Sequence, residues 1–223
     1  MKTRSIIFAF IIVFFNSCLI KSLHPFYTKE VISFDNNLLG IWESKGKTNW
    51  MIEDFKGRML KENDVDTFEE LDKSDQIVYA QYKNSYFVTI NKSNIQSFFL
   101  AVPFLIEDQL FLDFSPVMID NELPTLTQNH LLGAHSLVKL DRLENGAVSL
   151  KWFDEDRIKD LFKQKKIKIK HEKITGFFLE EEILLTAKPK ELQKFIRKYM
   201  ASEGEDKWKT DTKYILTRDL TKP

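Results

Sequence analysis

Two histidines lie close enough in the sequence to suggest metal or acid–base chemistry. His130 and His135 are five residues apart, which places them on neither one helix face nor one strand face, so a metal site would need a shaped loop. Asp113 and Asp120 are the carboxylates that would join such a site. Because nothing in the spacing requires these side chains to meet, we expect no bound metal.

Catalysis by a nucleophilic serine is the next alternative. Ser97, Ser136 and Ser149 fall on or near expected strands, but none stands in a Gly-x-Ser-x-Gly elbow. The chain also lacks a glycine-rich phosphate loop, a dinucleotide fingerprint and a His-Glu-x-x-His motif, so we expect no cofactor. A hydrolase of the cell envelope is therefore the third hypothesis, after two non-enzymatic ones.

The single cysteine, Cys18, ends a segment that is typical of an export signal. Lys2 and Arg4 precede ten apolar residues, Ile6 to Phe15, which are too few for a spanning helix of about 20 residues. With Ser17 before Cys18, the segment resembles a bacterial lipobox. The resemblance implies that Cys18 is diacylated, becomes the mature N-terminus and anchors the protein to a membrane. The alternative is an ordinary secretory signal with a chance cysteine.

The residues after Cys18 indicate a location. Leu19 is not the aspartate that retains lipoproteins at the inner membrane, and 19–22 lacks the acidic cluster that marks surface export, so the resemblance implies the periplasmic face of the outer membrane. We expect a signal peptide at 1–17, a lipid anchor and tether at 18–36, and one β-rich domain at 37–223.

Charge and composition exclude several classes. The 33 basic residues equal the 33 acidic ones, whereas a nucleic-acid-binding protein normally has a basic excess, so we expect no nucleic-acid partner. One cysteine excludes a disulfide framework. With 223 residues, 43% of them hydrophobic, the chain can bury a sizeable core.

Short apolar or alternating runs, separated by polar turns, predict antiparallel strands. Lys45-Gly46-Lys47 is the expected turn of one hairpin, and Asn145-Gly146 is the strongest hairpin signal. The expected strands are 38–44, 48–54, 77–82, 86–91, 98–106, 110–114, 136–143, 147–153, 166–174, 182–186 and 213–218. The segment Ser115–His130 is expected to be a long loop, a candidate lid over a site.

Two amphipathic helices are expected late in the chain. Asp154 is a suitable cap for a helix at 154–164, and Pro189 begins a second at 189–203. The second has an apolar stripe of Leu192, Phe195, Ile196, Tyr199 and Met200. The predicted fold class is mainly β, an antiparallel barrel or strongly curved sheet with two C-terminal helices packed on it. Between the helices, the lysines of 163–170 form either a solvated strand face or a surface for anionic lipid headgroups.

Four stretches together resemble an uncharacterised group of lipoproteins from Bacteroidetes-type bacteria. They are Leu23-His24-Pro25-Phe26-Tyr27-Thr28, Leu38-Leu39-Gly40-Ile41-Trp42, Phe111-Leu112-Asp113-Phe114 and Leu184-Leu185-Thr186-Ala187. Because that group is uncharacterised, the resemblance implies no particular activity.

Gly40-Ile41-Trp42 also resembles the Gly-x-Trp motif on the first strand of lipocalin and other calycin barrels. The resemblance implies that Trp42 closes one end of a barrel and that an arginine from a late strand, here Arg218, packs across its ring. A distance above about 6 Å between them would refute this interpretation.

The leading hypothesis is a non-enzymatic lipoprotein that binds a small apolar ligand inside its barrel. Alternating positions on one strand place Val148, Leu150 and Trp152 inward, with Trp42 at one end, as the ligand-binding residues. The alternative is a structural or assembly lipoprotein that binds other envelope proteins. A cavity of about 300 Å³ or more would favour the first hypothesis.

Overall fold

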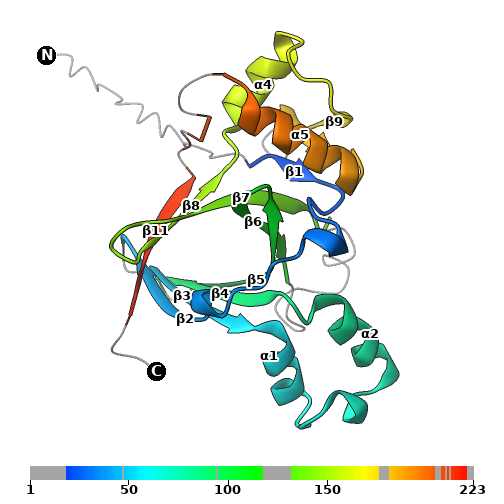
Figure 1. Ribbon diagram of the computed structural model, residues 1–223, viewed down its shortest axis with the longest axis vertical. Coiled ribbons are helices and arrows are strands. Elements are labelled where there is room, and N and C mark those ends of the chain that lie inside the picture. The colour runs from blue at the N-terminus through cyan, green and yellow to red at the C-terminus, as the bar shows by residue number, and fades with distance from the viewer. Residues whose placement is uncertain are drawn as a thin grey trace, which may run out of the picture.

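Eight strands of the chain form a closed antiparallel barrel (Figure 1). The computed structural model describes residues 19–46, 48–93, 95–117, 132–175, 181–203, 207–208, 210 and 212–219. The barrel follows chain order from β2 to β8, β6 pairs with β7, and β11 closes the ring between β8 and β2. The predicted fold class, mainly β with a barrel, is confirmed.

The barrel strands agree closely with the predicted ones. They are β2 (Gly40–Ser44), β3 (Thr48–Asp54), β4 (Tyr86–Lys92), β5 (Ile95–Ile106), β6 (Gln109–Pro116), β7 (His135–Arg142), β8 (Val148–Trp152) and β11 (Lys213–Arg218). Gly46 and Gly146 lie in the β2–β3 and β7–β8 turns with φ of 83° and 79°, values that glycine adopts without strain. The hairpins expected at these two turns are confirmed.

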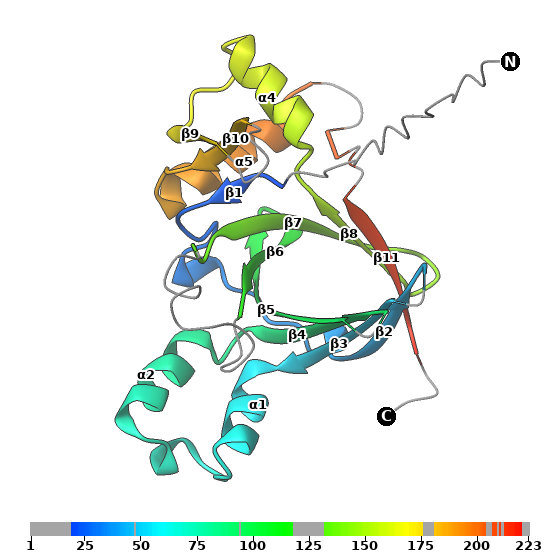
Figure 2. The same cartoon turned by 180° about the vertical axis from the view of Figure 1, so that it is seen from behind.

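Two long connections leave the barrel and lie on opposite sides of it (Figures 1 and 2). The first joins β3 to β4 and holds α1 (Phe55–Glu62), the 3₁₀ turn η3 (Phe68–Glu70) and α2 (Lys73–Tyr82). The second joins β8 to β11 and holds α4 (Glu155–Lys163), β9 (His171–Thr175), β10 (Glu181–Leu185) and α5 (Pro189–Ala201). The two expected C-terminal helices are therefore present, as α4 and α5.

The structure contradicts the expected strand at 77–82, which belongs to α2. The Asp72 side chain caps this helix by accepting a hydrogen bond from the Asp75 N–H at 2.8 Å. The apolar run that indicated a buried strand is largely at the surface, since Ile77 is 69% exposed. The strand expected at 166–174 is also shorter, because β9 begins only at His171.

Residues 19–36 are packed against the barrel, so the tether expected at 18–36 is wrong for them. β1 (Lys21–Ser22) pairs with β7 on one side and with β10 on the other. Ile20 and Phe26 are buried in an apolar core outside the barrel, which removes their side chains from water and stabilises this packing. Two 3₁₀ turns follow, η1 (Lys29–Val31) and η2 (Asn36–Leu38).

Two apolar cores result from this arrangement. One fills the barrel, and the other lies between the outer barrel wall, the N-terminal segment and the second connection. Phe104, Phe111 and Leu137 belong to the barrel wall in this outer core, whereas Leu192 and Ile196 come from α5. In the described ranges, no helix is long and apolar enough to span a membrane. The expected signal peptide, Cys18 and positions 118–130 of the expected lid lie outside the described residues.

Candidate functional site

The side chains predicted to bind a ligand do point into the barrel. Trp42, Val148, Leu150 and Trp152 all belong to the interior core, with at most 6% of their surface exposed. The space left among the interior side chains is about 10 Å³, which is roughly the volume that one water molecule needs. A ligand of the expected size, about 300 Å³ or more, does not fit. Aromatic and branched side chains fill the interior instead, as in other small barrels.

Trp42 and Arg218 close one end of this filled barrel. The Arg218 Cζ atom lies 4.6 Å from the centroid of the Trp42 ring, inside the 6 Å limit of a cation–π contact. The Trp42 indole donates to the Leu38 carbonyl at 2.9 Å, and the Arg218 guanidinium donates to the Asn37 carbonyl, so both tie η2 across the opening. Gly40 has a φ of 123°, and a Cβ there would lie 3.1 Å from Arg218 Nη1. This geometry explains physically why glycine precedes Trp42 by two residues.

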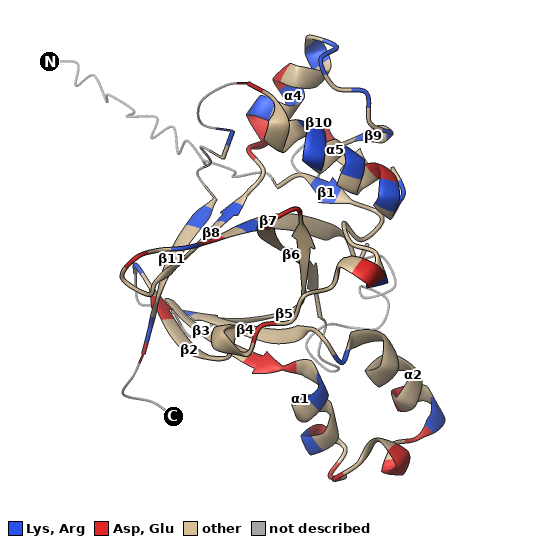
Figure 3. Ribbon diagram, in the orientation of Figure 1, with Lys and Arg blue, Asp and Glu red and all other residues tan. Residues whose placement is uncertain are grey.

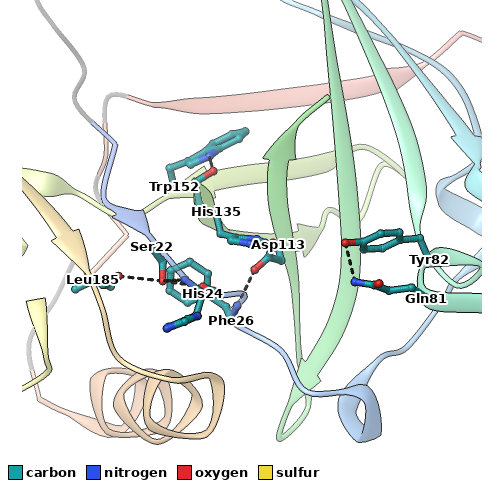
Figure 4. Close-up of polar contacts among 10 residues, drawn as sticks. Ser22, His24, Phe26, Gln81, Tyr82, Asp113, His135, Trp152 and Leu185 are labelled. Atoms are coloured by element: carbon teal, nitrogen blue, oxygen red, sulfur yellow. Dashed lines mark hydrogen bonds and ion pairs between the residues drawn. The ribbon is translucent and has the colours of Figure 1, made fainter. Parts of the chain in front are cut away.

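A buried acid–base pair lies on the outer wall of the barrel (Figure 4). Asp113, on β6, is 1% exposed, and its Oδ1 lies 2.6 Å from His135 Nδ1 on β7. Its other oxygen accepts a hydrogen bond at 2.7 Å from the backbone N–H of Phe26. The pair therefore fastens the N-terminal segment to two barrel strands.

Burial dominates the electrostatics of this pair. Removal from water raises the pKa of Asp113, and the hydrogen bond and charge of His135 oppose that rise. Burial, with a smaller contribution from the negative charge of Asp113, also raises the pKa of Tyr27 and of Tyr82. The Asp113 carboxyl group therefore interacts electrostatically with His135, Tyr27 and Tyr82.

Ser22 and Ser136, the serines beside His135, use their hydroxyls in hydrogen bonds that hold the structure together. Ser22 pairs with His135 in the β1–β7 register, but its buried hydroxyl donates to the His24 carbonyl at 2.7 Å. Ser136 accepts a hydrogen bond from the Trp152 indole at 3.1 Å. Both hydroxyls are therefore committed to structural hydrogen bonds.

The metal site considered from the sequence falls partly outside the structure. His130 and Asp120 lie among the residues that are not described. In the part that is described, no group of three or more His, Cys, Asp or Glu side chains is arranged to hold a metal ion.

A groove of about 750 Å³ lies outside the barrel, between α4, α5 and the connection 166–170. Its floor is apolar, formed by Leu161, Ile167, Ile169, Ala187 and Phe195. Cationic side chains line it as well: Arg157, Lys166, Lys168, Lys170, Lys194 and Lys198. Figure 3 shows the basic residues along α5 and α4. The groove combines an apolar surface with positive charge, which suits an amphipathic ligand.

Local structure places these side chains. The Asp154 side chain accepts from the Arg157 N–H at 3.0 Å and begins α4, so that Arg157 and Leu161 follow one turn apart. On α5, Lys194, Phe195, Lys198 and Tyr199 recur at spacings of three and four residues and share one face.

Sequence reasoning missed the groove, although it singled out most of its parts. The alternation of lysine and isoleucine at 166–170 predicts a strand whose lysine face is either solvated or turned to anionic lipid headgroups, and the apolar stripe of α5 predicts a helix face packed on the barrel. In the structure Leu192, Ile196 and Tyr199 of that stripe are buried, whereas Phe195 is half-buried and lines the groove. The useful signal was that both segments place lysines directly beside apolar residues.

Comparison with known proteins supplies no further guide. No protein-family profile matches the chain, and neither a curated protein nor a solved structure matches it. The function must therefore be argued from the geometry of the chain itself.

Proposed function

We propose that this protein is a non-enzymatic, lipid-anchored protein of the bacterial cell envelope that binds a small amphipathic molecule in the groove between α4 and α5. One contrast carries the proposal: the groove holds about 750 Å³, within the usual range of about 300–1,000 Å³ for small-molecule sites, whereas the barrel interior holds about 10 Å³. The barrel then serves as a rigid scaffold, and the ligand site lies on its outer layer.

The anchor is supported by the N-terminal sequence. A short basic region, ten apolar residues and Ser17-Cys18 form a segment like that of bacterial lipoproteins, and we place the mature protein on the periplasmic face of the outer membrane. In Cys18→Ser protein, we expect the acyl mass and the partition into detergent to be lost. Ser17→Ala keeps a small residue and should retain both. Unchanged membrane association of Cys18→Ser, with no acyl mass on the wild type, would overturn the anchor.

The proposed ligand site in the groove can be tested by identifying the small molecules that stay bound to the protein during purification. We would purify the intact lipoprotein from its native membrane and identify co-purifying small molecules by mass spectrometry. Ile167→Asp introduces charge into the groove floor, at a position outside helices and strands. Ile77→Asp is the matched control, because Ile77 is an exposed isoleucine on α2, which lies on the opposite side of the barrel.

A stoichiometric amphiphile on the wild type and on Ile77→Asp, but not on Ile167→Asp, is the expected result. Equal retention by all three proteins, or no retained molecule on any of them, would overturn the ligand site.

The second candidate function is binding of another envelope protein, and α2 favours it. Ile77 and Val78 are 69% and 39% exposed on a helix with no buried residue. A standard protein interface uses about 20–30 residues on each side, however, and two side chains are far fewer. The groove therefore carries the stronger argument.

A further inference from the structure

We infer that the groove between α4 and α5 takes a single-chain lipid with an anionic head, whose acyl chain lies on the apolar floor and whose head meets the lysines. This inference rests on the proposed function and names the ligand class of that same site. It depends on three features: the alternation at 166–170, the charge balance of the lining, and the absence of carboxylate partners for its lysines among the described residues.

The connection 166–170 supplies both halves of such a site. Ile169 is buried and Ile167 is half-buried, whereas the intervening Lys166, Lys168 and Lys170 are exposed. All five side chains line the groove, so apolar floor and charge alternate along it. A molecule lying along this connection meets methyl groups and ammonium groups at neighbouring positions.

The opposite wall, formed by α5, repeats this combination. Phe195 is half-buried and Tyr199 is buried, and both are ring neighbours of Phe153 in the outer core, with centroids 6.1 and 5.3 Å away. The exposed Lys194 and Lys198 lie beside them on the same helix face. The aromatic floor is therefore held rigidly, while the flexible lysine stems can adjust to a head group.

The charge of the lining is strongly one-sided. Six cationic side chains face two carboxylates, Glu191 and Glu203, although the whole chain is neutral. Glu191 is also engaged elsewhere, because its carboxylate accepts from the Lys188 N–H at 3.0 Å and caps α5. An anionic head would supply the charge that this lining lacks, whereas a neutral or cationic head would not.

The lysines of the groove are not paired with carboxylates of the described residues, whereas the Arg157 side chain hydrogen-bonds Tyr199. Among the residues that the structure describes, Lys166, Lys168, Lys170, Lys194 and Lys198 form no ion pair within 4.0 Å. Arg157 also has a buried Nε atom with no hydrogen-bond partner within the same set of residues. Unpartnered donors of this kind favour an incoming anionic oxygen, because charged hydrogen bonds are stronger than neutral ones.

The experiment compares two lipids that differ only in the head. The intact lipoprotein is reconstituted in phosphatidylcholine nanodiscs that carry, at equal mole fraction, either lysophosphatidylglycerol or lysophosphatidylcholine with the same photoreactive acyl chain. Crosslinked peptides are identified by mass spectrometry. We expect lysophosphatidylglycerol to label the groove about fivefold more than lysophosphatidylcholine, a difference of about 1 kcal/mol.

Two double variants make the result specific. Lys168→Gln with Lys194→Gln should reduce labelling by lysophosphatidylglycerol to the level of lysophosphatidylcholine. Lys61→Gln with Lys73→Gln removes the same charge from exposed positions of α1 and α2 and should leave labelling unchanged. Circular dichroism of both variants checks that the fold is intact.

The remaining outcomes separate the two proposals. Equal labelling of the groove by both lipids, lost in Ile167→Asp, would overturn the anionic head and leave the ligand site standing. No groove labelling by either lipid would overturn both. Labelling by lysophosphatidylglycerol that spreads over surface lysines and ignores Lys168 and Lys194 would mean attraction to a membrane surface, which also overturns the inference.

Discussion

Removal of the Asp113 carboxylate is expected to be among the most destabilising single changes outside the apolar cores. Asp113→Ala leaves the Phe26 N–H and the His135 ring without the oxygens that they face at 2.7 and 2.6 Å. A buried group that loses its hydrogen-bond partner costs about 1–3 kcal/mol, and Asp113→Ala removes the partner of two such groups. We expect a loss of about 3–5 kcal/mol in the free energy of unfolding, which for a chain of this length lowers Tm by roughly 6–20 °C.

Asp113→Asn should be compared with Asp113→Ala, because it removes the charge of the carboxylate but keeps its size and a hydrogen-bonding group. Its amide oxygen can still accept from the Phe26 N–H, and its NH₂ can donate to His135 Nδ1. We therefore expect it to lose much less stability than Asp113→Ala.

The same variant also changes the dependence of stability on pH, and the sign follows from the raised pKa. Because burial raises the pKa of Asp113 in the folded state, the folded protein keeps this proton to a higher pH than the unfolded chain does. The resulting penalty is absent below the ordinary aspartate pKa of about 3.9, grows above it, and levels off once the pH exceeds the raised pKa. Stability of the wild type relative to Asp113→Asn should thus fall as the pH rises above about 4 and become constant above the raised pKa. Urea unfolding of the three proteins across this range measures both effects. If Asp113→Ala unfolds within about 0.5 kcal/mol of the wild type, the proposed fastening of the N-terminal segment is refuted.

Three further substitutions test the barrel end and the outer core. Gly40→Ala should destabilise the fold by about 1–3 kcal/mol, since it forces a φ of 123° on a residue with a Cβ and crowds Arg218; an unchanged Tm would contradict this. Arg218→Gln should cost about 0.5–1 kcal/mol through loss of the exposed cation–π contact with Trp42, and near-ultraviolet circular dichroism should report the altered indole. Ile196→Ala removes a side chain with no exposed surface and should cost about 2–5 kcal/mol in thermal unfolding; a value below about 1 kcal/mol would mean that α5 does not pack as described.

Local patterns predicted much of the secondary structure, because the interactions that form it are close in sequence. Strand alternation with glycine at the turns placed the hairpins around Gly46 and Gly146, and capping residues with helical spacing placed α4 and α5. The same reasoning failed at Ile77, because β-branched and aromatic residues predict a strand only when a sheet buries them. Here the local cap at Asp72 and the surface position of Ile77 favour a helix.

Only part of the candidate site could be predicted from the sequence. Trp42, Val148, Leu150 and Trp152 were placed inward by alternation alone, but whether room remains beside them depends on the summed volumes of side chains from eight strands.

The sequence by itself therefore determined the neutral charge and the local elements that build a barrel, and it predicts an N-terminal leader that ends in a cysteine. Tertiary structure decided that the barrel is filled, that the segment from Leu19 to Asn36 packs on its wall, and that Asp113 meets His135. It also joined α4, the connection 166–170 and α5 into one basic groove. These contacts join residues distant in the chain, and the strand register that brings them together is set by the whole sheet rather than by any local pattern.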